Sequence, residues 1–449
     1  MDFYSIRDNR KMEKLVMTKT ICVVGLGYIG LPTAVMFANH GMKVHGVDVN
    51  TLAVKSIQEK KLHIEEFGLQ ERLNKAVDGG FLTASSTPIE ADIFIIAVPS
   101  PINPDHTANL NYVRSATASI VPYLKPGNLV ILESTVPPKT VENVMLPELI
   151  KSNLQIGEEL FVSHSPERVI PGKVFEELVN NDRIIGGVNV KSAELTKELY
   201  ETFVKGNIHI TSATTAELVK VIENTYRDVN IAFANELAKI GELLGVNIWE
   251  AIKLANYHPR VNIHLPGPGV GGHCIAVDPW FLVELGEGRA QITQLARNTN
   301  DSMPSYTAQK TQAFLNECGI AGATVGVLGL AFKGNIDDMR ESPSTIVIDE
   351  LEKLGLKVIS YDPHILENKH KTQTQSFEEV TKNADILVVL TDHKEFASYN
   401  PSVITMKNKL VFDTKNCLQR KLWEDAGFSY KLLGETHTYT AKESQLINI

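Results

Sequence analysis

The sequence lacks the features of a nucleic-acid-binding protein or a membrane protein. Acidic residues outnumber basic ones by 53 to 44, which gives a net charge of −9. No basic excess therefore exists to neutralise nucleic-acid phosphates or anionic lipid. No apolar run approaches the roughly 18 residues that a membrane-spanning helix needs. We expect neither nucleic acid nor a membrane as a partner.

Cysteine is also scarce. The four residues are far apart and form no CxxC pair, so they suit neither a zinc site nor a disulfide framework; they are Cys22, Cys274, Cys318 and Cys417. We predict a cytoplasmic protein without a metal site. Residues 1–17 mix charges without an apolar run, which is not a signal peptide, and we expect them to form a disordered leader.

The residues that are present predict an α/β protein. Apolar runs alternate with helix-like spacing over residues 18–210 and again over 311–449, and a glycine- and proline-poor helical stretch lies in between, within 211–310. This alternation is typical of parallel sheets wound with helices. We expect two doubly wound Rossmann-like domains joined by a central helical segment.

A glycine motif follows the first apolar run. It reads GLGYIG, stands between a predicted strand and a predicted helix, and the next strand closes with Asp48. This context is the dinucleotide-binding fingerprint: the first glycine permits a tight turn, the second admits the pyrophosphate, and the third lets helix and strand pack. Asp48 would bind ribose hydroxyls and repel a 2′-phosphate, which favours NAD over NADP. The expected NAD contacts are Gly25, Gly27, Tyr28, Ile29, Gly30 and Asp48.

Polar residues follow three further apolar runs. They are Ser100, Thr135 and Glu167. Because ligands lie beyond the carboxyl ends of parallel strands, these side chains should point toward one crevice. Each alone is equally well explained as turn chemistry, but three at equivalent strand ends favour a binding site.

The middle segment predicts one long helix that opens with a capping box at Thr214 and Glu217. Lys220, Asn224 and Arg227 share one face of it. A solvated helix face is the simpler interpretation of such a stripe. A buried role becomes more credible because the segment leads to His258-Pro-Arg260 and then to PGPGVGGHCIAVD at residues 266–278.

That glycine-rich loop cannot form a regular helix or strand, and it presents Cys274 and Asp278. Taken alone, it is a tight loop with an inert cysteine. In the last third, the run at residues 324–330 leads into another turn without the GxGxxG pattern. There Lys333 and Arg340 are available to bind a second phosphate-bearing group.

These motifs together resemble the UDP-glucose/GDP-mannose dehydrogenases, from about Thr18 to the C-terminus. The resemblance is carried by GLGYIGLP, ILESTVPP, SPERVIPG, AELVKVIENTYRDVNIAFANE, GPGVGGHCIAVDPWF and GLAFKGNIDDMRESPS. It implies an NAD-binding domain at 18–210, a central dimerisation and catalytic-loop region at 211–310, and a UDP-sugar-binding domain at 311–449.

The resemblance also implies a four-electron oxidation of a sugar C6 hydroxyl to a carboxylate, with two NAD used in succession. Cys274 would be the nucleophile that carries a thiohemiacetal and then a thioester. Lys220 would assist proton transfer, with Asn224 and Asp278 positioning it or a water. Glu167 would act as base in thioester hydrolysis, and Thr135 would contact the nicotinamide or a water.

Further contacts are implied in the same way. Arg340 and Ser100 would contact NAD, and the residue matching Arg260 reaches a neighbouring subunit in the family, so we expect a homodimer or larger homo-oligomer. The expected substrate contacts are Arg168, Val169, Lys220, Asn224, Arg227, His258, Arg260, Gly271, Phe332, Lys333 and Lys415.

Two departures bear on the substrate. UDP-glucose-type members often carry Ser before the cysteine and Lys before the aspartate, where this chain has His273 and Val277. We therefore expect a UDP-N-acetylhexosamine, with UDP-N-acetyl-D-mannosamine favoured and UDP-N-acetyl-D-glucosamine as the alternative. Two rival hypotheses are a two-electron β-hydroxyacid-type dehydrogenase and a non-catalytic nucleotide-sugar sensor.

Overall fold

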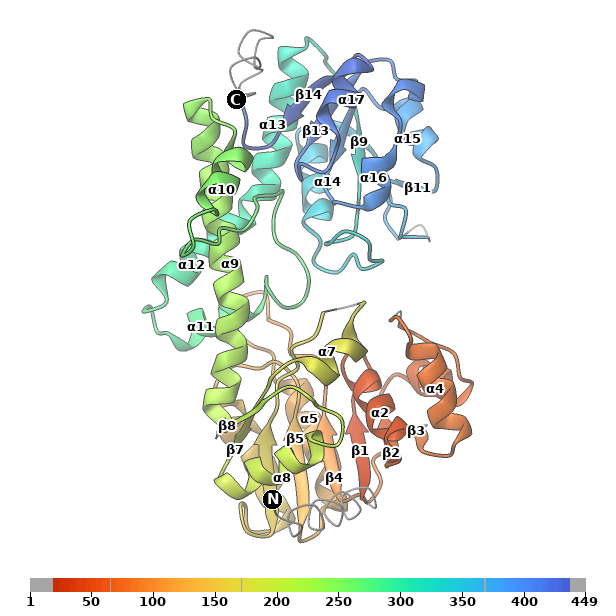
Figure 1. Ribbon diagram of the computed structural model, residues 1–449, viewed down its shortest axis with the longest axis vertical. Helices are drawn as coiled ribbons and strands as arrows, with labels where there is room; N and C mark the ends of the chain where they lie inside the picture. Colours follow the sequence, from red (N-terminus) through yellow and green to blue (C-terminus); the bar gives the residue numbers. More distant parts are fainter. Residues whose placement is uncertain (1–18, 65, 171, 367–368, 437–449) are drawn as a thin grey trace, which may run out of the picture. The chain divides into compact units, whose positions relative to one another are not determined.

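The computed structural model describes residues 19–64, 66–170, 172–366 and 369–436 (Figure 1). The leader expected over residues 1–17 lies outside this part of the chain. Two compact units are present: unit 1 comprises Met1–Glu223 and Trp280–Leu285, and unit 2 comprises Asn224–Pro279 and Gly286–Ile449. Among the described residues, no helix is both long and apolar enough to cross a membrane.

Unit 1 is built on an eight-stranded sheet, counted over the described residues, in the order β3-β2-β1-β4-β5-β6-β7-β8. Its pairings are parallel except between β6 and β7. The first six positions follow the dinucleotide-binding strand order. The strands are β1 (Thr20–Val24), β2 (Lys43–Val47), β3 (Leu82–Ser85), β4 (Ile93–Ile96), β5 (Asn128–Leu132), β6 (Leu160–His164), β7 (Arg183–Gly187) and β8 (Ile208–Ser212).

Helices cover both faces of this sheet. They are α2 (Gly30–Asn39), α3 (Thr51–Gln58), α4 (Leu69–Asp78), α5 (Asn111–Ile120), η1 (Val121–Tyr123), η2 (Val141–Met145), α6 (Leu146–Leu149), η3 (Ile150–Ser152), α7 (Val174–Asn180) and α8 (Val190–Tyr200). Successive residues of β1 point to opposite faces, so Ile21 and Val23 join a core with α2, α4 and α8, whereas Cys22 and Val24 join one with α5 and η2. Burial raises the pKa of the Cys22 thiol to about 11, so this cysteine is a core residue.

Unit 2 repeats the same strand order in a six-stranded, all-parallel sheet, again within the described residues: β11-β10-β9-β12-β13-β14. The strands are β9 (Thr324–Leu328), β10 (Lys357–Tyr361), β11 (Gln373–Thr374), β12 (Ile386–Val389), β13 (Leu410–Asp413) and β14 (Ser429–Leu432). The prediction of a second doubly wound sheet is confirmed.

Helices also pack on both sides of the second sheet. One core joins β9 to α13 and α14, and the other joins the opposite face to α10, α15 and α17. The helices are α10 (Ile248–Ala255), α12 (Gln291–Asp301), α13 (Met303–Glu317), α14 (Pro343–Lys353), α15 (Phe377–Asn383), α16 (Lys394–Ser398), η4 (Pro401–Val403) and α17 (Arg420–Asp425).

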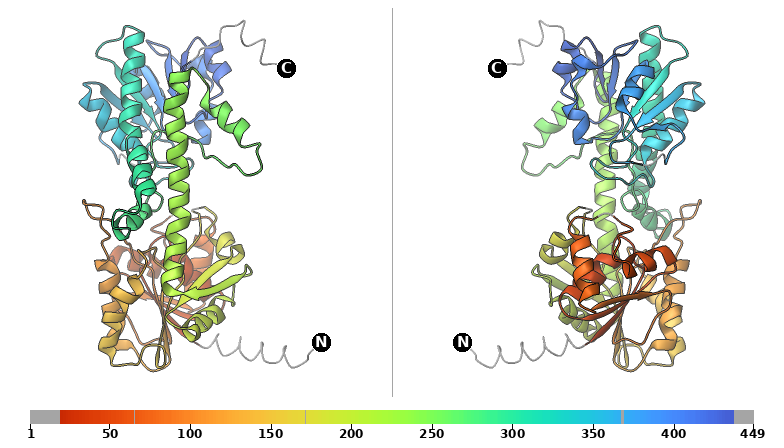
Figure 2. Two further views of the ribbon diagram at one scale, coloured as in Figure 1. Left: turned by 90° about the vertical axis from the view of Figure 1, so that its left-hand side faces the viewer. Right: turned by 90° about the vertical axis from the view of Figure 1, so that its right-hand side faces the viewer.

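Two helices belong to both units. The long helix α9 (Ala213–Leu244), visible from two sides in Figure 2, passes from unit 1 to unit 2 after Glu223. The short helix α11 (Asp278–Leu285) begins in unit 2 and continues in unit 1, where Trp280 stacks on His106 at 3.9 Å between ring centroids. The Glu284 carboxylate accepts a hydrogen bond from the Ala108 amide at 2.9 Å.

The capping box predicted at the start of α9 is wrong. The Ser212 hydroxyl accepts the hydrogen bond from the Thr215 amide at 3.2 Å. The Glu217 carboxylate instead accepts hydrogen bonds from the Lys139 amide at 2.6 Å and the Val141 amide at 2.8 Å, at the start of η2. The Glu217 side chain therefore caps the start of another helix, far away along the chain, and not the start of its own helix.

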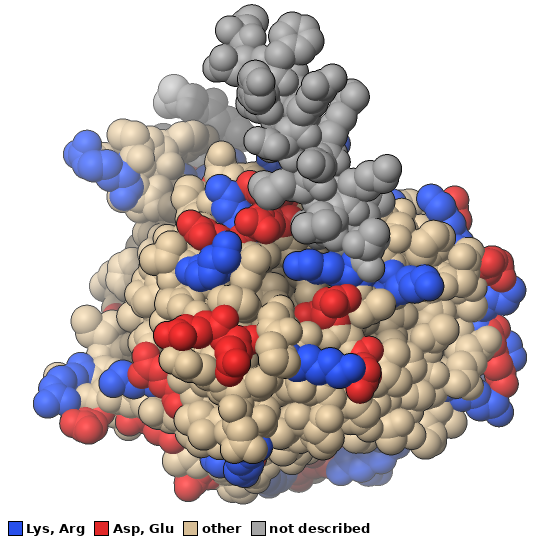
Figure 3. All heavy atoms as spheres, turned by 90° about the horizontal axis from the view of Figure 1, so that it is seen from below, with Lys and Arg blue, Asp and Glu red and all other residues tan. Residues whose placement is uncertain are grey.

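Charge of both signs is distributed over the surface. On the face shown in Figure 3, Lys and Arg side chains lie interspersed with Asp and Glu side chains. Mixed charge of this kind is typical of a solvated protein surface.

Candidate active site

The glycine motif of unit 1 forms a tight turn after β1. Gly25 has φ +96°, and a Cβ there would lie 2.4 Å from the Ala97 carbonyl oxygen. A Cβ on Gly30 would lie 1.8 Å from the Gly25 carbonyl oxygen, so this position also requires glycine for packing. Gly27 differs, because a Cβ there would have no atom of the chain within 4 Å. The open space at Gly27 fits a ligand that approaches the backbone, as a dinucleotide pyrophosphate does.

Asp48 closes β2 beside this turn. Its Oδ2 accepts a hydrogen bond from the Leu26 amide at 2.8 Å, and its Oδ1 accepts one from the Asn50 amide at 2.8 Å. The residue stays partly exposed, and each carboxylate oxygen can accept a second bond. The sequence did not point to His63, whose Nε2 lies 2.8 Å from the Leu26 carbonyl and fixes the turn from the other side. These residues fit the adenosine ribose of NAD.

The structure brings together two of the strand-end residues. The Ser100 hydroxyl, after β4, donates a hydrogen bond to the carbonyl of Thr135, after β5. The neighbouring Ser134 hydroxyl donates to the Val98 carbonyl at 2.6 Å. The two loops are thus joined at the edge where a Rossmann sheet binds its ligand.

Glu167 and Arg168 follow β6 and are both held by charged partners. Glu167 is 8% exposed; its Oε2 lies 2.5 Å from Arg183, and its Oε1 accepts the Arg168 amide at 2.7 Å. The Arg168 guanidinium pairs with Glu223 at 2.7 Å and donates to the Asp182 carbonyl at 2.8 Å. Arg168 is therefore anchored to α9 by its side chain, and the next residue, Val169, packs against the unit 1 core.

The glycine-rich loop of unit 2 packs against the turn that follows β9. A Cβ on Gly271 would lie 2.5 Å from the Glu341 carbonyl oxygen and 2.7 Å from Pro343. Gly272 has φ +83°, and a Cβ there would lie 2.8 Å from the ring of Phe332. The sequence suggested that these glycines admit a ligand, and the structure gives a further reason, which is close packing within the chain.

Asparagine side chains hold the segment that leads into this loop. The side-chain oxygen Oδ1 of Asn235 accepts a hydrogen bond from the Gly267 amide at 2.9 Å, and Oδ1 of Asn230 accepts one from the His264 amide at 2.7 Å. Asn235 is fully buried, and its side-chain NH2 group donates to Asn300 at 2.9 Å. The base of the loop is fixed to α9 although it contains no regular secondary structure.

Cys274 and Asp278 stand at the end of the loop. Cys274 is exposed. Its backbone carbonyl accepts a hydrogen bond at 2.8 Å from the amide of Asp278, the first residue of α11. The Asp278 Oδ2 accepts a hydrogen bond from Asn224 Nδ2 at 2.6 Å, and both side chains are buried. Lys220 lies one turn before Asn224 on α9 and is half-buried. It belongs to unit 1, whereas Asn224, Cys274 and Asp278 belong to unit 2.

The other basic residues of unit 2 that were predicted to bind the substrate are Lys415, Lys333, Arg227, His258 and Arg260. The Lys415 ammonium lies 3.5 Å from where a Gly267 Cβ would stand, and Lys333 is exposed one residue after Phe332. Arg227, His258 and Arg260 are all exposed, and the Arg260 guanidinium lies 3.4 Å from His258 Nε2. These positions offer cations for a diphosphate on unit 2.

Arg340 and Asp338 form a charged pair that acts on His273. The Arg340 guanidinium pairs with Asp338, with Nε 2.9 Å from Oδ1 and Nη2 2.6 Å from Oδ2. Partial burial and the charge of Arg340 lower the pKa of His273, against the opposing charges of Asp338 and Glu341. His273, which no sequence pattern explained, thus stands within electrostatic reach of the turn after β9.

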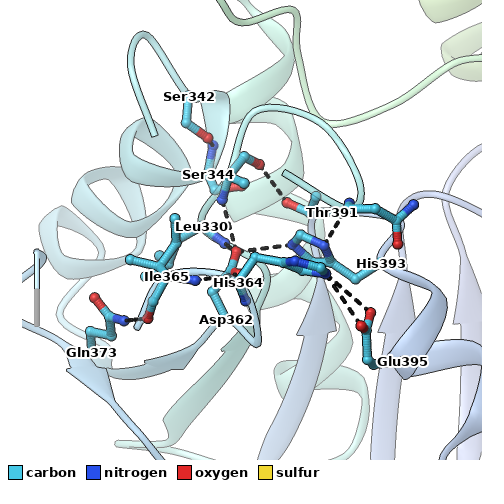
Figure 4. Close-up of polar contacts among 12 residues, drawn as sticks. Leu330, Ser342, Ser344, Asp362, His364, Ile365, Gln373, Thr391, His393 and Glu395 are labelled. Carbon is cyan, nitrogen blue, oxygen red and sulfur yellow. Dashed lines mark hydrogen bonds and ion pairs between the residues drawn. The ribbon is translucent and has the colours of Figure 1, made fainter. Parts of the chain in front are cut away.

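Figure 4 shows the polar contacts at the ends of β10 and β12, where His364, His393 and Glu395 have ligand-type atoms within 4.8 Å of one another. His393 accepts the Asn335 amide at Nδ1, at 2.9 Å, and faces Asp362 Oδ2 with Nε2, at 3.0 Å. Both nitrogens are thus engaged by protein groups, which leaves His393 no lone pair for a metal ion. We interpret this group as a hydrogen-bond network.

Sequence reasoning missed Arg183, Glu133 and Tyr200, which form a buried cluster around Glu167. The one available signal was Arg183 itself, a charged residue that opens the short apolar run RIIGG. A charged side chain in such a run is expected to be buried with a partner. The partners come from distant parts of the chain and could not be identified from it.

Comparison with known proteins agrees with this geometry. Models of the UDP-glucose/GDP-mannose dehydrogenase family match along the chain: the NAD binding domain at residues 19–204, the central domain at 214–302 and the UDP binding domain at 326–420.

Similar individual proteins cover nearly the whole chain. A UDP-N-acetyl-D-mannosamine dehydrogenase of Methanococcus maripaludis is 49% identical over 425 residues, 93% of this chain and 97% of the relative. A solved UDP-D-ManNAc dehydrogenase of Pyrococcus horikoshii superposes with a TM-score of 0.87 at 41% identity, covering 92% and 99% of the two chains. A solved UDP-N-acetyl-mannosamine dehydrogenase of Staphylococcus aureus gives 0.86 at 44% identity, covering 93% and 99%.

Proposed function

Because the chain belongs to the UDP-glucose/GDP-mannose dehydrogenase family, we propose that it oxidises UDP-N-acetyl-D-mannosamine at C6 to the uronate. The protein is an NAD-dependent UDP-sugar dehydrogenase. The substrate is supported by UDP-N-acetyl-D-mannosamine dehydrogenases that match this chain almost end to end, and by His273 and Val277 in place of the UDP-glucose-type residues. The observation that carries the chemistry is an exposed Cys274 at the end of a rigidly held glycine loop.

Cys274 gives the reaction its covalent step. Its sulfur would add to the C6 aldehyde, and the hemithioacetal would lose a hydride and a proton to become a thioester. Water would then cleave the C–S bond, yielding the carboxylate and returning the thiol. Bound NAD supplies the oxidant by accepting one hydride in each of the two oxidations.

Other residues of the chain would orient groups and move protons. Asn224 holds Asp278 by a 2.6 Å hydrogen bond. This buried pair can position a water or the ammonium of Lys220, which would stabilise developing negative charge on the C6 oxygen. Glu167 would take a proton from the water that cleaves the thioester. Lys333, Lys415 and Arg227 supply cations for the diphosphate.

The reaction stoichiometry tests this proposal. Two NADH should form for each UDP-N-acetyl-D-mannosamine consumed, followed by absorbance, with UDP-N-acetyl-D-glucosamine and UDP-glucose as comparison substrates. A ratio of one would indicate a two-electron dehydrogenase, and faster turnover of UDP-N-acetyl-D-glucosamine would overturn the substrate assignment. No turnover of any UDP-sugar would favour a nucleotide-sugar sensor.

The Cys274→Ser variant tests the covalent step. Acid formation should fall by at least about a thousandfold, because serine is a far poorer nucleophile at neutral pH. Affinity for NAD, measured by calorimetry, should stay unchanged, since Cys274 and the glycine turn belong to different units. Cys318→Ser is the matched control, because this other exposed cysteine lies outside the loop. Retained acid formation in Cys274→Ser would refute the thioester route.

We also propose a homodimer or larger homo-oligomer. One face of α9 carries apolar side chains that are exposed in the chain by itself, spaced four or seven residues apart: Leu218, Ile222, Tyr226, Phe233, Ile240 and Leu244. An exposed apolar stripe of this length favours burial against another copy. Light scattering after gel filtration should show at least a dimer, and Phe233→Glu should shift it toward the monomer.

Two further expectations remain proposals. The protein is proposed to act in the cytoplasm, where its separated cysteines stay reduced. We also propose that the chain consists of three functional regions: an NAD-binding domain (18–210), a central region (211–310) and a UDP-sugar-binding domain (311–449).

A further inference from the structure

A buried group of charges surrounds Glu167 in unit 1. Glu133 follows β5, Glu167 follows β6, and Arg183 opens β7. Because β7 runs antiparallel to β6, its first residue lies beside the end of β6 rather than at the far edge of the sheet. All three side chains are at least nine-tenths buried.

One cation stands between two carboxylates in this group. The Arg183 guanidinium is 2.5 Å from Glu167 Oε2 and 3.5 Å from Glu133 Oε1. It also donates to the Ser165 hydroxyl at 2.9 Å and lies 4.0 Å above the ring of Tyr200. With both carboxylates ionised, the group carries one net negative charge away from water.

Glu133 is the carboxylate of this group that has no role in the proposed reaction. Its Oε1 accepts a hydrogen bond from the Tyr200 hydroxyl, and its Oε2 accepts one from the Thr33 hydroxyl of α2 at 3.1 Å. Burial raises the pKa of Glu133 to about 7, against the opposing charge of Arg183. We therefore expect its charge to change within the neutral pH range.

Glu133 competes with Glu167 for the guanidinium of Arg183. A carboxylate paired closely with a single arginine is a weak base, because the cation stabilises its ionised form. The second oxygen of Glu167 is further stabilised by the Arg168 amide. A second carboxylate on the same arginine offsets this effect, because the positive charge is then shared.

We propose that Arg183 and Glu133 are positioning residues for Glu167: Arg183 fixes its carboxylate, and the charge of Glu133 shares Arg183, so that Glu167 stays available to take a proton. The inference rests on the proposed function, in which Glu167 takes a proton from the water that cleaves the Cys274 thioester. Neither residue touches the substrate in this scheme.

A pH dependence follows from this arrangement. The groups that face Glu133 are Arg183 from β7, Tyr200 from α8, Thr33 from α2 and Glu167 from the loop after β6. When Glu133 is protonated at low pH, Arg183 has Glu167 as its one charged partner in this group. When Glu133 ionises, the two carboxylates share Arg183, and Glu167 is held less tightly in its ion pair. Thioester hydrolysis should therefore accelerate as the pH rises through neutrality.

The Glu133→Gln variant tests the inference, since it removes the charge and keeps the shape. In single turnovers, thioester hydrolysis at pH 8 should slow by about tenfold, because the base is permanently weakened. The neutral pH step should disappear, and mass spectrometry should detect the Cys274 adduct accumulating. NADH formation before hydrolysis should keep its rate. Thr33→Val is the matched control: it removes a hydrogen bond to Glu133 but no charge, so the pH step should remain.

The outcomes separate the inference from the proposed function. If the wild-type protein forms one NADH per sugar nucleotide, or no Cys274 adduct, the proposed function fails. If it forms two NADH and the adduct, but Glu133→Gln hydrolyses the adduct with the wild-type rate or retains the pH step, the inference is wrong. Should Glu133→Gln not fold, the wild-type profile decides, because hydrolysis that is flat between pH 6 and 8 would overturn the inference by itself.

Discussion

The two units contain the same turn after the first strand of each sheet. In unit 1, Gly25 has φ +96° and its amide donates to the Val47 carbonyl at 2.8 Å. In unit 2, Gly329 has φ +96° and its amide donates to the Tyr361 carbonyl, also at 2.8 Å. The following amide then donates to an aspartate that ends the neighbouring strand, at 2.8 Å to Asp48 and at 2.6 Å to Asp362.

The surroundings of the two aspartates differ. Asp48 is partly exposed, and helix α2 starts directly after its glycine turn. Asp362 is 2% exposed and is covered by His393, while a long loop carrying Phe332, Lys333 and Arg340 separates Gly329 from helix α14. An aspartate sealed in this way has no capacity to bind a ribose.

The comparison shows how one fold serves two ligands. In unit 1 the glycine turn and its aspartate are both partly open to a ligand. In unit 2 the aspartate fixes the turn from inside, so we expect ligand contacts to come from exposed residues of the loop such as Lys333. The strand order alone would not distinguish these two uses.

The largest difference between the two aspartates should appear in their contributions to the free energy of unfolding. Asp362→Ala would leave His393 and the backbone amides of Leu330, Ala331 and His364 without their acceptor. We expect a loss of about 3–5 kcal/mol in the free energy of unfolding, measured by urea denaturation. Asp48→Ala should cost about 1 kcal/mol, because water can replace the lost bonds. Equal losses would contradict the distinction between a sealed and an open aspartate.

For NAD binding the order should be reversed, with a larger effect of changing Asp48 than of changing Asp362. Asp48→Asn keeps an acceptor for the Leu26 amide but loses the charge, so the Kd for NAD should rise about tenfold and the preference for NAD over NADP should shrink. Calorimetric titration measures both. Asp362→Asn is the control and should leave the Kd for NAD unchanged. A weakened Kd in that variant would mean that the unit 2 aspartate also contributes to the cofactor site.

The smallest expected effect is a pH dependence in unit 2. Burial by itself raises the pKa of Asp362, but hydrogen bonds from His393, Ala331 and Leu330 outweigh it and hold the pKa below its usual value. A lowered folded-state pKa stabilises the fold above the usual carboxyl range, and this contribution disappears as the pH falls through the folded-state value.

The variant Asp362→Asn measures this effect. Its stability deficit at pH 7 should be about 1–2 kcal/mol and should shrink as the pH falls below the usual carboxyl range. Glu395→Gln, which breaks a partly exposed pair with His364, should change stability by less than about 1 kcal/mol. A deficit that stays constant with pH would show that charge on Asp362 does not contribute.

Local patterns in the sequence predicted the parts of the fold that depend on neighbouring residues. Residues 43–47 and 128–132 form the strands expected there, and Gly25 adopts the tight turn. Strands β3, β7, β8, β11 and β14 were not predicted; four of them are sheet edges, and β7 lies beside the edge strand β8. Their burial depends on helices that a linear pattern does not place.

Long-range partners were the other limit. The sequence singled out Glu167 but not Arg183 or Glu133, which are distant along the chain and meet only because β7 reverses direction. A long-range partner also explains the wrong prediction for Glu217, whose carboxylate accepts hydrogen bonds from the amides of Lys139 and Val141. Sequence patterns thus identified reactive residue types, whereas the residues that tune them required the three-dimensional structure.

The path of the chain between the units has a practical consequence for dissecting the protein. Unit 1 is completed by Trp280–Leu285, so a fragment that stops at Glu223 would lack the ring that stacks on His106 and the carboxylate that caps Ala108. A fragment that starts at Asn224 would retain that segment without its partners and would begin in the middle of α9. Neither half can be expressed as a simple truncation, and a workable unit 1 needs residues 280–285 grafted back by a linker.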